Sequence, residues 1–160
     1  MADLIVRPYR ASTDFRAVLD AQCDLYQLNF PRFVCTPQFV AEQGARLRQA
    51  VRRPYEHALF VLEDAGSVQG FVWTVIRMDL QGVFGSVDQV YLKPAYRGRG
   101  LGARLMQAAH AHLAESGVSH CRLYVTESNQ AAVALYKRLG YDVIRLEMES
   151  TLSLRESPGD

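Results

Sequence analysis

The segment Arg97-Gly98-Arg99-Gly100-Leu101-Gly102 separates a predicted strand at 83–93 from a predicted helix at 101–116. Its alternate glycines have no Cβ atom, so a ligand can approach the main chain closely. The N-terminus of a helix also presents unpaired N–H groups and a partial positive charge, which suit a phosphate. Arg104 adds a third cationic donor to the two arginines of the segment. The segment therefore predicts a turn that binds a diphosphate.

Two common phosphate-binding motifs do not fit this segment. A P-loop would end in Gly-Lys-Ser/Thr, and no such tripeptide follows. A dinucleotide fingerprint requires G-x-G-x-x-G, whereas the spacing here is G-x-G-x-G. The segment resembles instead the R/Q-x-x-G-x-G/A signature of the GNAT superfamily of acetyl-CoA-dependent N-acetyltransferases. By itself so short a pattern leaves a plain basic turn as the alternative.

A second stretch strengthens this resemblance. Residues 129–141, NQAAVALYKRLGY, are similar to the other motif that the family shares, N-x-x-A-x-x-L-Y-x-x-x-G-F/Y. The two motifs follow one another at the separation found in the family, and each lies on the expected kind of element. The chain is therefore identified as a member of the GNAT superfamily.

Composition limits the other classes of function. The chain has 160 residues, 49% hydrophobic and 22% charged, which suits one soluble globular domain. A net charge of +1 favours neither nucleic acid nor a membrane surface as a partner. No apolar stretch is long enough to cross a bilayer, and the N-terminus has no signal-peptide pattern. Cys23, Cys35 and Cys121 are unevenly spaced, which argues against a disulfide framework or a metal site and for a reducing cytoplasm.

Hydrophobic periodicity and turn residues predict alternating strands and helices. The predicted strands cover residues 4–8, 57–63, 68–78, 83–93, 120–126 and 141–154, the last broken once near Ser150. The predicted helices begin at caps among Ser12, Thr13 and Asp14, at Thr36, at 101 and at Ser128-Asn129. In the first helix, Cys23 lies on the apolar side and is expected to be a small core residue. An exposed last strand would support strand exchange or a homodimer.

With the resemblance, these elements imply a single α/β (α+β) domain over residues 1–154, followed by a loose tail at 155–160. The expected sheet is mixed but mostly antiparallel, has six to seven strands, is flanked by about four helices and splays between its fourth and fifth strands.

The resemblance implies acetyl-CoA as the cosubstrate and no metal. Backbone N–H groups of the glycine turn would bind its pyrophosphate, and the main chain of the fourth strand would pair with its pantetheine arm. Asn129 is an N-cap or contacts that arm as well. The expected cofactor-binding residues are Val90, Tyr91, Leu92, Arg97, Gly98, Arg99, Gly100, Leu101, Gly102, Ala103 and Asn129.

In this family a neutral amine attacks the thioester directly, so protons must leave the amine and reach the leaving sulfur. Tyr136 is expected to be the general acid, because a phenol can donate to a thiolate; the alternative is a core aromatic. Asp88 is the candidate general base, acting through water, or else a solvated carboxylate at a strand end. Tyr124 stands where a branch that acetylates protein N-termini often carries glutamate, which disfavours that substrate. Cys35 has no partner histidine that would make it an acyl-carrying nucleophile.

The acceptor amine belongs to a small molecule or a peptide. The resemblance places one wall of its cleft at Tyr26, Phe30 and Phe33, which would otherwise pack the first helices onto the sheet. Two other functions compete: a catalytically silent module that binds acyl-CoA, and a binder of nucleotide or RNA phosphates.

Overall fold

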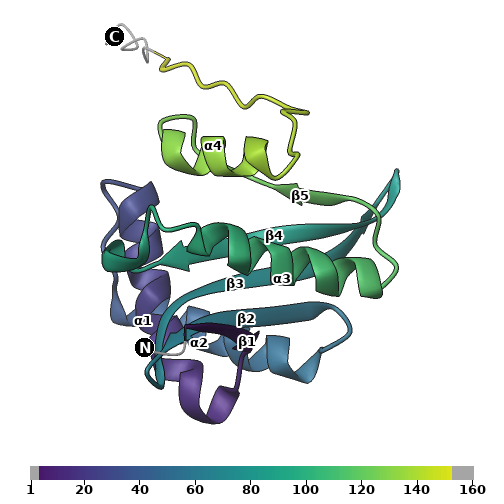
Figure 1. Ribbon diagram of the computed structural model, residues 1–160. Coiled ribbons are helices and arrows are strands. Elements are labelled where there is room, and N and C mark those ends of the chain that lie inside the picture. Colours follow the sequence, from purple (N-terminus) through teal and green to yellow (C-terminus); the bar gives the residue numbers. More distant parts are fainter. Residues whose placement is uncertain (1–3, 153–160) are drawn as a thin grey trace, which may run out of the picture.

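The computed structural model describes residues 4–152 and contains one five-stranded sheet, four α-helices and a short 3-10 helix. In chain order the elements are β1 (Ile5–Pro8), α1 (Ala11–Asn29), α2 (Pro37–Arg52), β2 (His57–Asp64), β3 (Ser67–Asp79), β4 (Gly82–Leu92), η1 (Pro94–Tyr96), α3 (Leu101–Glu115), β5 (Cys121–Leu123) and α4 (Gln130–Arg138). This α/β architecture agrees with the prediction, and Figure 1 shows its arrangement.

The strands lie side by side in chain order, β1-β2-β3-β4-β5. The first four are joined antiparallel, and β5 is parallel to β4, so the sheet is mixed and mostly antiparallel as expected. The parallel pairing joins only Gly85, Ser86 and Val87 to the three residues of β5. Beyond Val87, β4 continues for five residues without pairing to β5. This is the predicted splay between the fourth and fifth strands.

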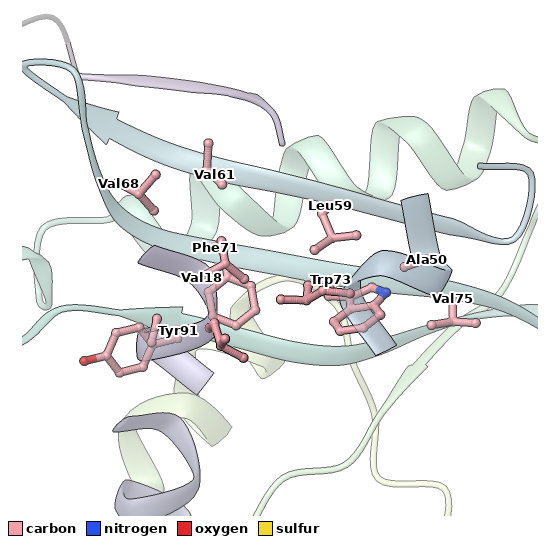
Figure 2. Packing of buried hydrophobic residues seen from close by; sticks show 12 residues of the cluster. Val18, Ala50, Leu59, Val61, Val68, Phe71, Trp73, Val75 and Tyr91 are labelled. Atoms are coloured by element: carbon pink, nitrogen blue, oxygen red, sulfur yellow. The ribbon is translucent and has the colours of Figure 1, made fainter. Parts of the chain in front are cut away.

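Successive side chains of the central strands enter two separate cores, because a strand directs alternate residues to opposite faces. In β3, Phe71 belongs to the core under α1 and α2, and Val72 belongs to the core under α3. In β2, Val61 and Leu62 divide in the same way. Figure 2 shows the first of these cores, packed around Phe71 and Trp73. The sheet is therefore covered on both faces, which explains why its central strands are apolar throughout.

Helix α3 buries the face that its periodicity predicted. Leu101, Leu105, Ala109 and Leu113 are all at most 5% exposed. This spacing places them on one side of the helix, above Val72 and Val87 of the sheet. Gly117 has a φ of +78°, a conformation that favours glycine, and lies directly after the helix end, as predicted. The helix thereby fixes where the glycine turn lies at its N-terminus.

The prediction of six to seven strands is wrong, because the described residues form five. Residues 141–152 contain no strand, and every residue from Asp142 to Leu152 is exposed. Their alternating sequence suits a strand, but a strand requires a neighbour to accept its backbone hydrogen bonds, and none lies beside them in the described structure. The end of that predicted strand (153–154) and the proposed tail (155–160) lie outside the described residues.

The start of α1 also differs from the prediction. The helix begins at Ala11, so the N-cap residue is Arg10 and none of Ser12, Thr13 and Asp14 occupies that position. Asp14 lies in the first turn instead, where its carboxylate accepts a hydrogen bond of 2.7 Å from the backbone N–H of Arg10. Its charge also suits the positive end of the helix. The predicted N-cap is therefore wrong: the side chain of Arg10 makes no cap hydrogen bond, and Asp14 contacts the backbone from within the first turn.

Candidate active site

The glycine turn joins the end of β4 to the start of α3. Gly98 and Gly100 have φ angles of +71° and +73°, and a Cβ atom built on either would meet no atom within 4 Å. At the start of α3, the Arg104 N–H donates to the Gly100 carbonyl at 3.3 Å. The N–H groups at the helix start have no acceptor within the helix. This open, donor-rich backbone has the properties that a diphosphate requires.

The three arginines near the turn play different structural roles. The Nε of Arg97 donates to the Leu92 carbonyl at 2.9 Å, and its guanidinium lies over the Tyr91 ring. Arg99 lies over the Tyr96 ring at 5.5 Å. Arg104 donates to the carbonyl of Leu4 at 3.0 Å, so it ties the start of the described chain to α3. All three arginines are exposed, and Arg97 and Arg99 lie directly beside the glycines of the turn.

The last residues of β4 present their main chain at the splay. Val90 and Leu92 pack into the core under α3, and Tyr91 points to the other face, where its hydroxyl donates to Asp24 at 3.1 Å. Their side chains are thus core groups, as expected. On the side toward β5 their backbone has no strand partner in the described structure. That is the arrangement in which an extended ligand can add itself as a strand.

Asp88 occupies a bulge in β4. Thr74 of β3 pairs with Val87 and Trp73 pairs with Gln89, so Asp88 is the extra residue between them. Its side chain is only 13% exposed and lies on the face covered by α2. The alternative of a solvated carboxylate at a strand end is therefore wrong. A bulge directs a side chain out of the regular alternation, which explains why the sequence pattern did not place it.

Both carboxylate oxygens of Asp88 accept hydrogen bonds. Ser86 Oγ donates to Oδ1 at 2.7 Å, and an Arg77 guanidinium nitrogen donates to Oδ2 at 2.7 Å. Arg46 of α2 approaches the same oxygen at 4.0 Å and also lies over the Trp73 ring. These donors hold the carboxylate in one orientation. Neither Arg46 nor Arg77 belongs to a sequence motif, and only the fold brings them to Asp88.

Tyr136 lies on the opposite face, in the core under α3. It is 8% exposed and shares that core with Val87 and Leu101, so it is a core aromatic as well as a candidate acid. Burial raises its pKa to about 12. Tyr136 therefore remains protonated at neutral pH and keeps a proton to donate. Its ring also meets the Tyr141 ring edge to face, with centroids 5.8 Å apart.

Asn129 is confirmed as the N-cap of α4. Its side-chain oxygen accepts a hydrogen bond of 3.2 Å from the Ala132 N–H. This bond fixes the start of the helix that carries Tyr136. Gly102, at the start of α3, supports the same helix, because a Cβ atom there would come within 3.1 Å of Leu135. The two motifs of the sequence are thus in contact through α3 and α4.

The candidate acceptor residues form an aromatic cluster at the end of α1. Tyr26 lies 5.8 Å from Phe30 and 5.3 Å from Phe33, measured between ring centroids. Phe39 of α2, which the sequence analysis did not select, completes the cluster at 4.8 Å from Tyr26 and 4.7 Å from Phe33. None of these rings belongs to the two buried cores of the sheet. The cluster joins α1, α2 and their connection to one another rather than packing them onto the sheet.

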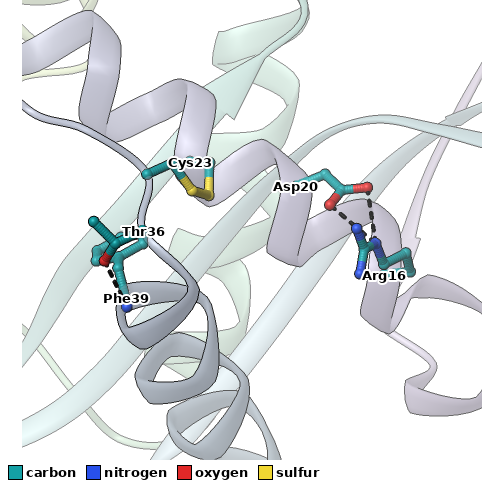
Figure 3. The surroundings of a disulfide bond; sticks show 6 residues. Arg16, Asp20, Cys23, Thr36 and Phe39 are labelled. Carbon is teal, nitrogen blue, oxygen red and sulfur yellow. Dashed lines mark hydrogen bonds and ion pairs between the residues drawn. A yellow bond between two sulfur atoms is a disulfide. The ribbon is translucent and has the colours of Figure 1, made fainter.

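A disulfide beside this cluster was not predicted. Cys23 of α1 is bonded to Cys35 in the loop before α2, with their Cα atoms 5.5 Å apart (Figure 3). Cys23 is therefore not a free core thiol, and Cys35 is not a candidate nucleophile. The next residue, Thr36, caps α2 as predicted by accepting from the Phe39 N–H at 3.2 Å. Spacing alone did not reveal the pair, since twelve positions separate two elements whose approach depends on the fold.

Two other properties of the described residues bear on the site. No helix between residues 4 and 152 combines the length and apolar character that a membrane span requires. In the same range, no three His, Cys, Asp or Glu side chains are grouped so that they could bind a metal ion.

Comparison with known proteins supports the resemblance seen in the sequence. The model of the acetyltransferase (GNAT) family matches residues 19–141. A mycothiol acetyltransferase from Mycobacteroides abscessus is 34% identical over 89% of this chain and 50% of its own length. Another, from Thermobispora bispora, is 37% identical over 62% of this chain and 37% of its own length. The chain thus spans half or less of the length of these relatives.

Solved structures share the fold at low sequence identity. A PaiA N-acetyltransferase from Thermoplasma acidophilum, determined in complex with coenzyme A, has a TM-score of 0.74 and 16% identity, covering 91% of this chain and 93% of its own. The glucosamine-6-phosphate N-acetyltransferase of Arabidopsis thaliana has a TM-score of 0.71 and 17% identity, covering 94% and 99%. The family model covers most of the chain, including both motifs up to Tyr141, so this protein belongs to the GNAT family of acetyltransferases.

Proposed function

We propose that this protein transfers the acetyl group of acetyl-CoA to a primary amine in a ternary complex. One observation carries the proposal: Asp88 and Tyr136 lie on opposite faces of the sheet, beside the point where β4 and β5 stop pairing. An amine that approaches from the α2 face and a thioester held on the α3 face would meet at that point. Each would then have a proton-transfer group on its own side.

The residues present fit acetyl-CoA as the cosubstrate. Its pyrophosphate would lie against the N–H groups from Gly98 to Ala103, with Arg97 and Arg99 nearby as cations. Its pantetheine arm would pair with the free backbone of residues 90–92. The Val90 N–H would face the thioester oxygen and stabilise the negative charge that develops there. Acetyl-CoA supplies the acetyl group as a thioester.

Proton balance assigns the two side chains different roles. The amine nitrogen forms a bond to the thioester carbon, and the carbon–sulfur bond breaks with its electron pair leaving on sulfur. The product amide carries one proton fewer than the attacking amine, and the sulfur must gain one. Tyr136 donates to the sulfur, since its raised pKa keeps the phenol protonated. Asp88, oriented by Ser86 and Arg77, accepts the amine proton through a water molecule.

The acceptor amine would enter beside the aromatic cluster of Tyr26, Phe30 and Phe33. Phe30 is 55% exposed, so part of this cluster is available for contact. Its apolar rings favour an acceptor with an apolar or sugar-like body rather than a polyanion. Because the relatives compared above are named mycothiol acetyltransferases, amines related to mycothiol belong in the first set of acceptors tested.

The decisive experiment measures release of free CoA from acetyl-CoA over a panel of amines and peptide N-termini. We expect release that depends on one class of amine. Replacing Tyr136 with Phe should lower kcat at least about 100-fold while acetyl-CoA still raises the melting temperature, because only the proton donor is lost. Tyr55→Phe is the matched control, since that tyrosine is 92% exposed and distant in sequence from both motifs.

An Asp88→Asn variant tests the second role in the same assay. We expect a loss of kcat/KM, because the amide does not accept the proton. Unchanged kinetics in both variants would contradict the assigned roles. Stabilisation by acetyl-CoA without any turnover would instead favour the silent acyl-CoA-binding module. If acetyl-CoA causes neither turnover nor stabilisation, the proposed function is wrong.

A further inference from the structure

Arg46 of α2 lies beside the candidate base with most of its hydrogen-bonding capacity unused. Its guanidinium lies over the Trp73 ring, 5.5 Å from the ring centroid, and one of its nitrogens is 4.0 Å from Asp88 Oδ2. That separation is too long for a hydrogen bond. Of its several N–H donors, one makes a hydrogen bond within the described residues, a long contact of 3.4 Å with Gln43. The side chain is 47% exposed, so a ligand can reach the other donors.

The charges around Asp88 do not cancel. Arg46 and Arg77 both lie against its carboxylate, and in the described part of the chain neither pairs with another acidic side chain. His57, beside Trp73, does not alter this balance. Its Nδ1 accepts a hydrogen bond from the Trp73 indole at 3.1 Å, and burial lowers its pKa, so the ring is neutral at pH 7. One positive charge is therefore left over on the face from which the amine would approach.

We propose that Arg46 binds a carboxylate of the acceptor, and that the acceptor is a free amino acid rather than a peptide N-terminus. A guanidinium binds a carboxylate through two parallel hydrogen bonds. An amino acid carries its carboxylate and its amine on one carbon atom, so binding at Arg46 would keep the amine close to Asp88. In a peptide that carboxylate has become an uncharged amide. The role given to the amine rests on the proposed acetyl transfer.

The size of the excess charge favours a carboxylate over a phosphate ester. A phosphate monoester carries about −1.5 to −2 at neutral pH, which exceeds the single positive charge that is left over. The nearby carboxylate of Asp88 would also repel the second negative charge. An acceptor that enters beside the aromatic cluster should have an apolar body, so leucine is the amino acid chosen for the test.

Trp73 provides a local probe of this contact, because it is the single tryptophan of the chain and lies under Arg46. Its fluorescence is followed while L-leucine or L-leucinamide is added, with CoA present so that no acetyl transfer occurs. Isothermal titration calorimetry of the same pairs gives affinities that do not depend on the tryptophan. We expect leucine to bind about tenfold or more tighter than leucinamide, since the amide lacks the charge that strengthens the hydrogen bonds.

Three variants locate the contact. Arg46→Gln should remove the preference for leucine, whereas Arg46→Lys should keep part of it, because lysine retains the charge without the planar fork. Arg48→Gln is the matched control: Arg48 lies on the same helix and over another aromatic ring, that of Phe15, and the variant should bind like the wild type. In the assay of CoA release, Arg46→Gln should raise the KM for leucine about tenfold or more and leave the KM for leucinamide and both kcat values nearly unchanged.

The outcomes separate this proposal from the proposed function. Equal affinity of the wild type for leucine and leucinamide, or binding of neither, would overturn carboxylate recognition. A preference that Arg46→Gln retains, or that Arg48→Gln also loses, would equally overturn it. The expected preference in binding without any release of CoA would support the carboxylate site at Arg46 and contradict the acetyl transfer.

Discussion

Gly100 occupies a backbone conformation that residues with a Cβ atom rarely adopt. Its φ of +73° turns the chain from η1 into α3, and nothing lies within 4 Å of where a Cβ would be. Gly100 is one of the glycines of the R/Q-x-x-G-x-G/A motif, so the sequence already places a glycine at this position. Replacing Gly100 should therefore have two separate effects: it strains the backbone, and it fills space that a ligand would occupy.

Replacing Gly100 with Ala should weaken acetyl-CoA binding about tenfold or more. The left-handed conformation costs an alanine about 1 kcal/mol, and its methyl group would occupy the space proposed for the pyrophosphate. Isothermal titration calorimetry with acetyl-CoA measures the change in affinity.

Gly66→Ala separates the two effects of that replacement. Gly66, in the β2–β3 turn, has a φ of +77° and equally open surroundings, so an alanine there is strained to the same degree. It should lower the melting temperature as much as Gly100→Ala does and leave the affinity unchanged. Equal losses of affinity in the two variants would contradict a phosphate site at the turn.

At the scale of elements, the Cys23–Cys35 disulfide joins α1 to the loop before α2. It lies beside the Tyr26 cluster, which joins the same two helices through aromatic contacts. The position of this helical pair at its outer end therefore depends on a covalent bond and on few buried side chains. The disulfide also removes one argument for a reducing cytoplasm, since that expectation rested on unpaired cysteines.

Replacing Cys35 with Ser should lower the free energy of unfolding by about 3 kcal/mol, because the open chain gains the entropy that a bridge across this loop removes. For a chain of this length the melting temperature should fall by roughly 6–12 °C. Thermal unfolding followed by circular dichroism, with and without a reductant, measures the effect.

Cys121→Ser provides the control for the disulfide. Cys121 is a free thiol on β5, so this variant should keep the sensitivity of the wild type to reductant. Cys35→Ser, in contrast, should be insensitive to it. A wild type whose melting temperature does not respond to reductant would show that the bond contributes nothing to stability.

At the scale of the whole molecule, one buried ionic network joins the first strand, the first helix and the second strand. Arg7 of β1 contacts Asp14 of α1 at 2.7 Å and Glu63 of β2 at 2.6 Å. Burial by itself would raise the pKa of Asp14, but hydrogen bonds from Arg7, the Arg10 N–H and Thr13 outweigh it and lower the pKa. The carboxylate is thus favoured by folding.

Asp14→Asn should cost about 3 kcal/mol at neutral pH, because it removes one partner of a buried ion pair. A carboxyl whose pKa falls on folding stabilises the fold above its unfolded pKa of about 3.9, and that contribution is lost as the pH falls through the folded value. The difference between variant and wild type should therefore shrink below about pH 4. Denaturant unfolding from pH 3 to 7 measures it.

Asp20→Asn is the comparison for this pH dependence. Asp20 pairs with Arg16 on the exposed surface of α1, where its side chain is 61% accessible (Figure 3). Such a pair contributes little, so the variant should follow the wild type at every pH. An Asp14→Asn deficit that stays constant down to pH 3 would mean that packing, and not charge, explains the loss.

Local chemistry allowed much of this protein to be predicted from its sequence. The glycine turn before α3, the cap at Asn129 and the buried face of α3 depend on residues a few positions apart. Turn glycines and an apolar repeat of 3.6 residues can be read directly from the sequence, so they predict such local features. The family motifs lie within these same segments, so the acid candidate Tyr136 was found together with its helix.

Tertiary structure alone decided the rest. The bulge that places Asp88 beside Arg46 and Arg77, the bond between Cys23 and Cys35, and the lack of a strand neighbour for residues 142–152 in the described structure all depend on which distant segments meet. An alternating stretch predicts a strand but not the neighbour that completes it, because backbone hydrogen bonds do not depend on side-chain identity. The sequence by itself therefore determined the kind of each local element and the chemistry of its turn, and the fold determined their pairing.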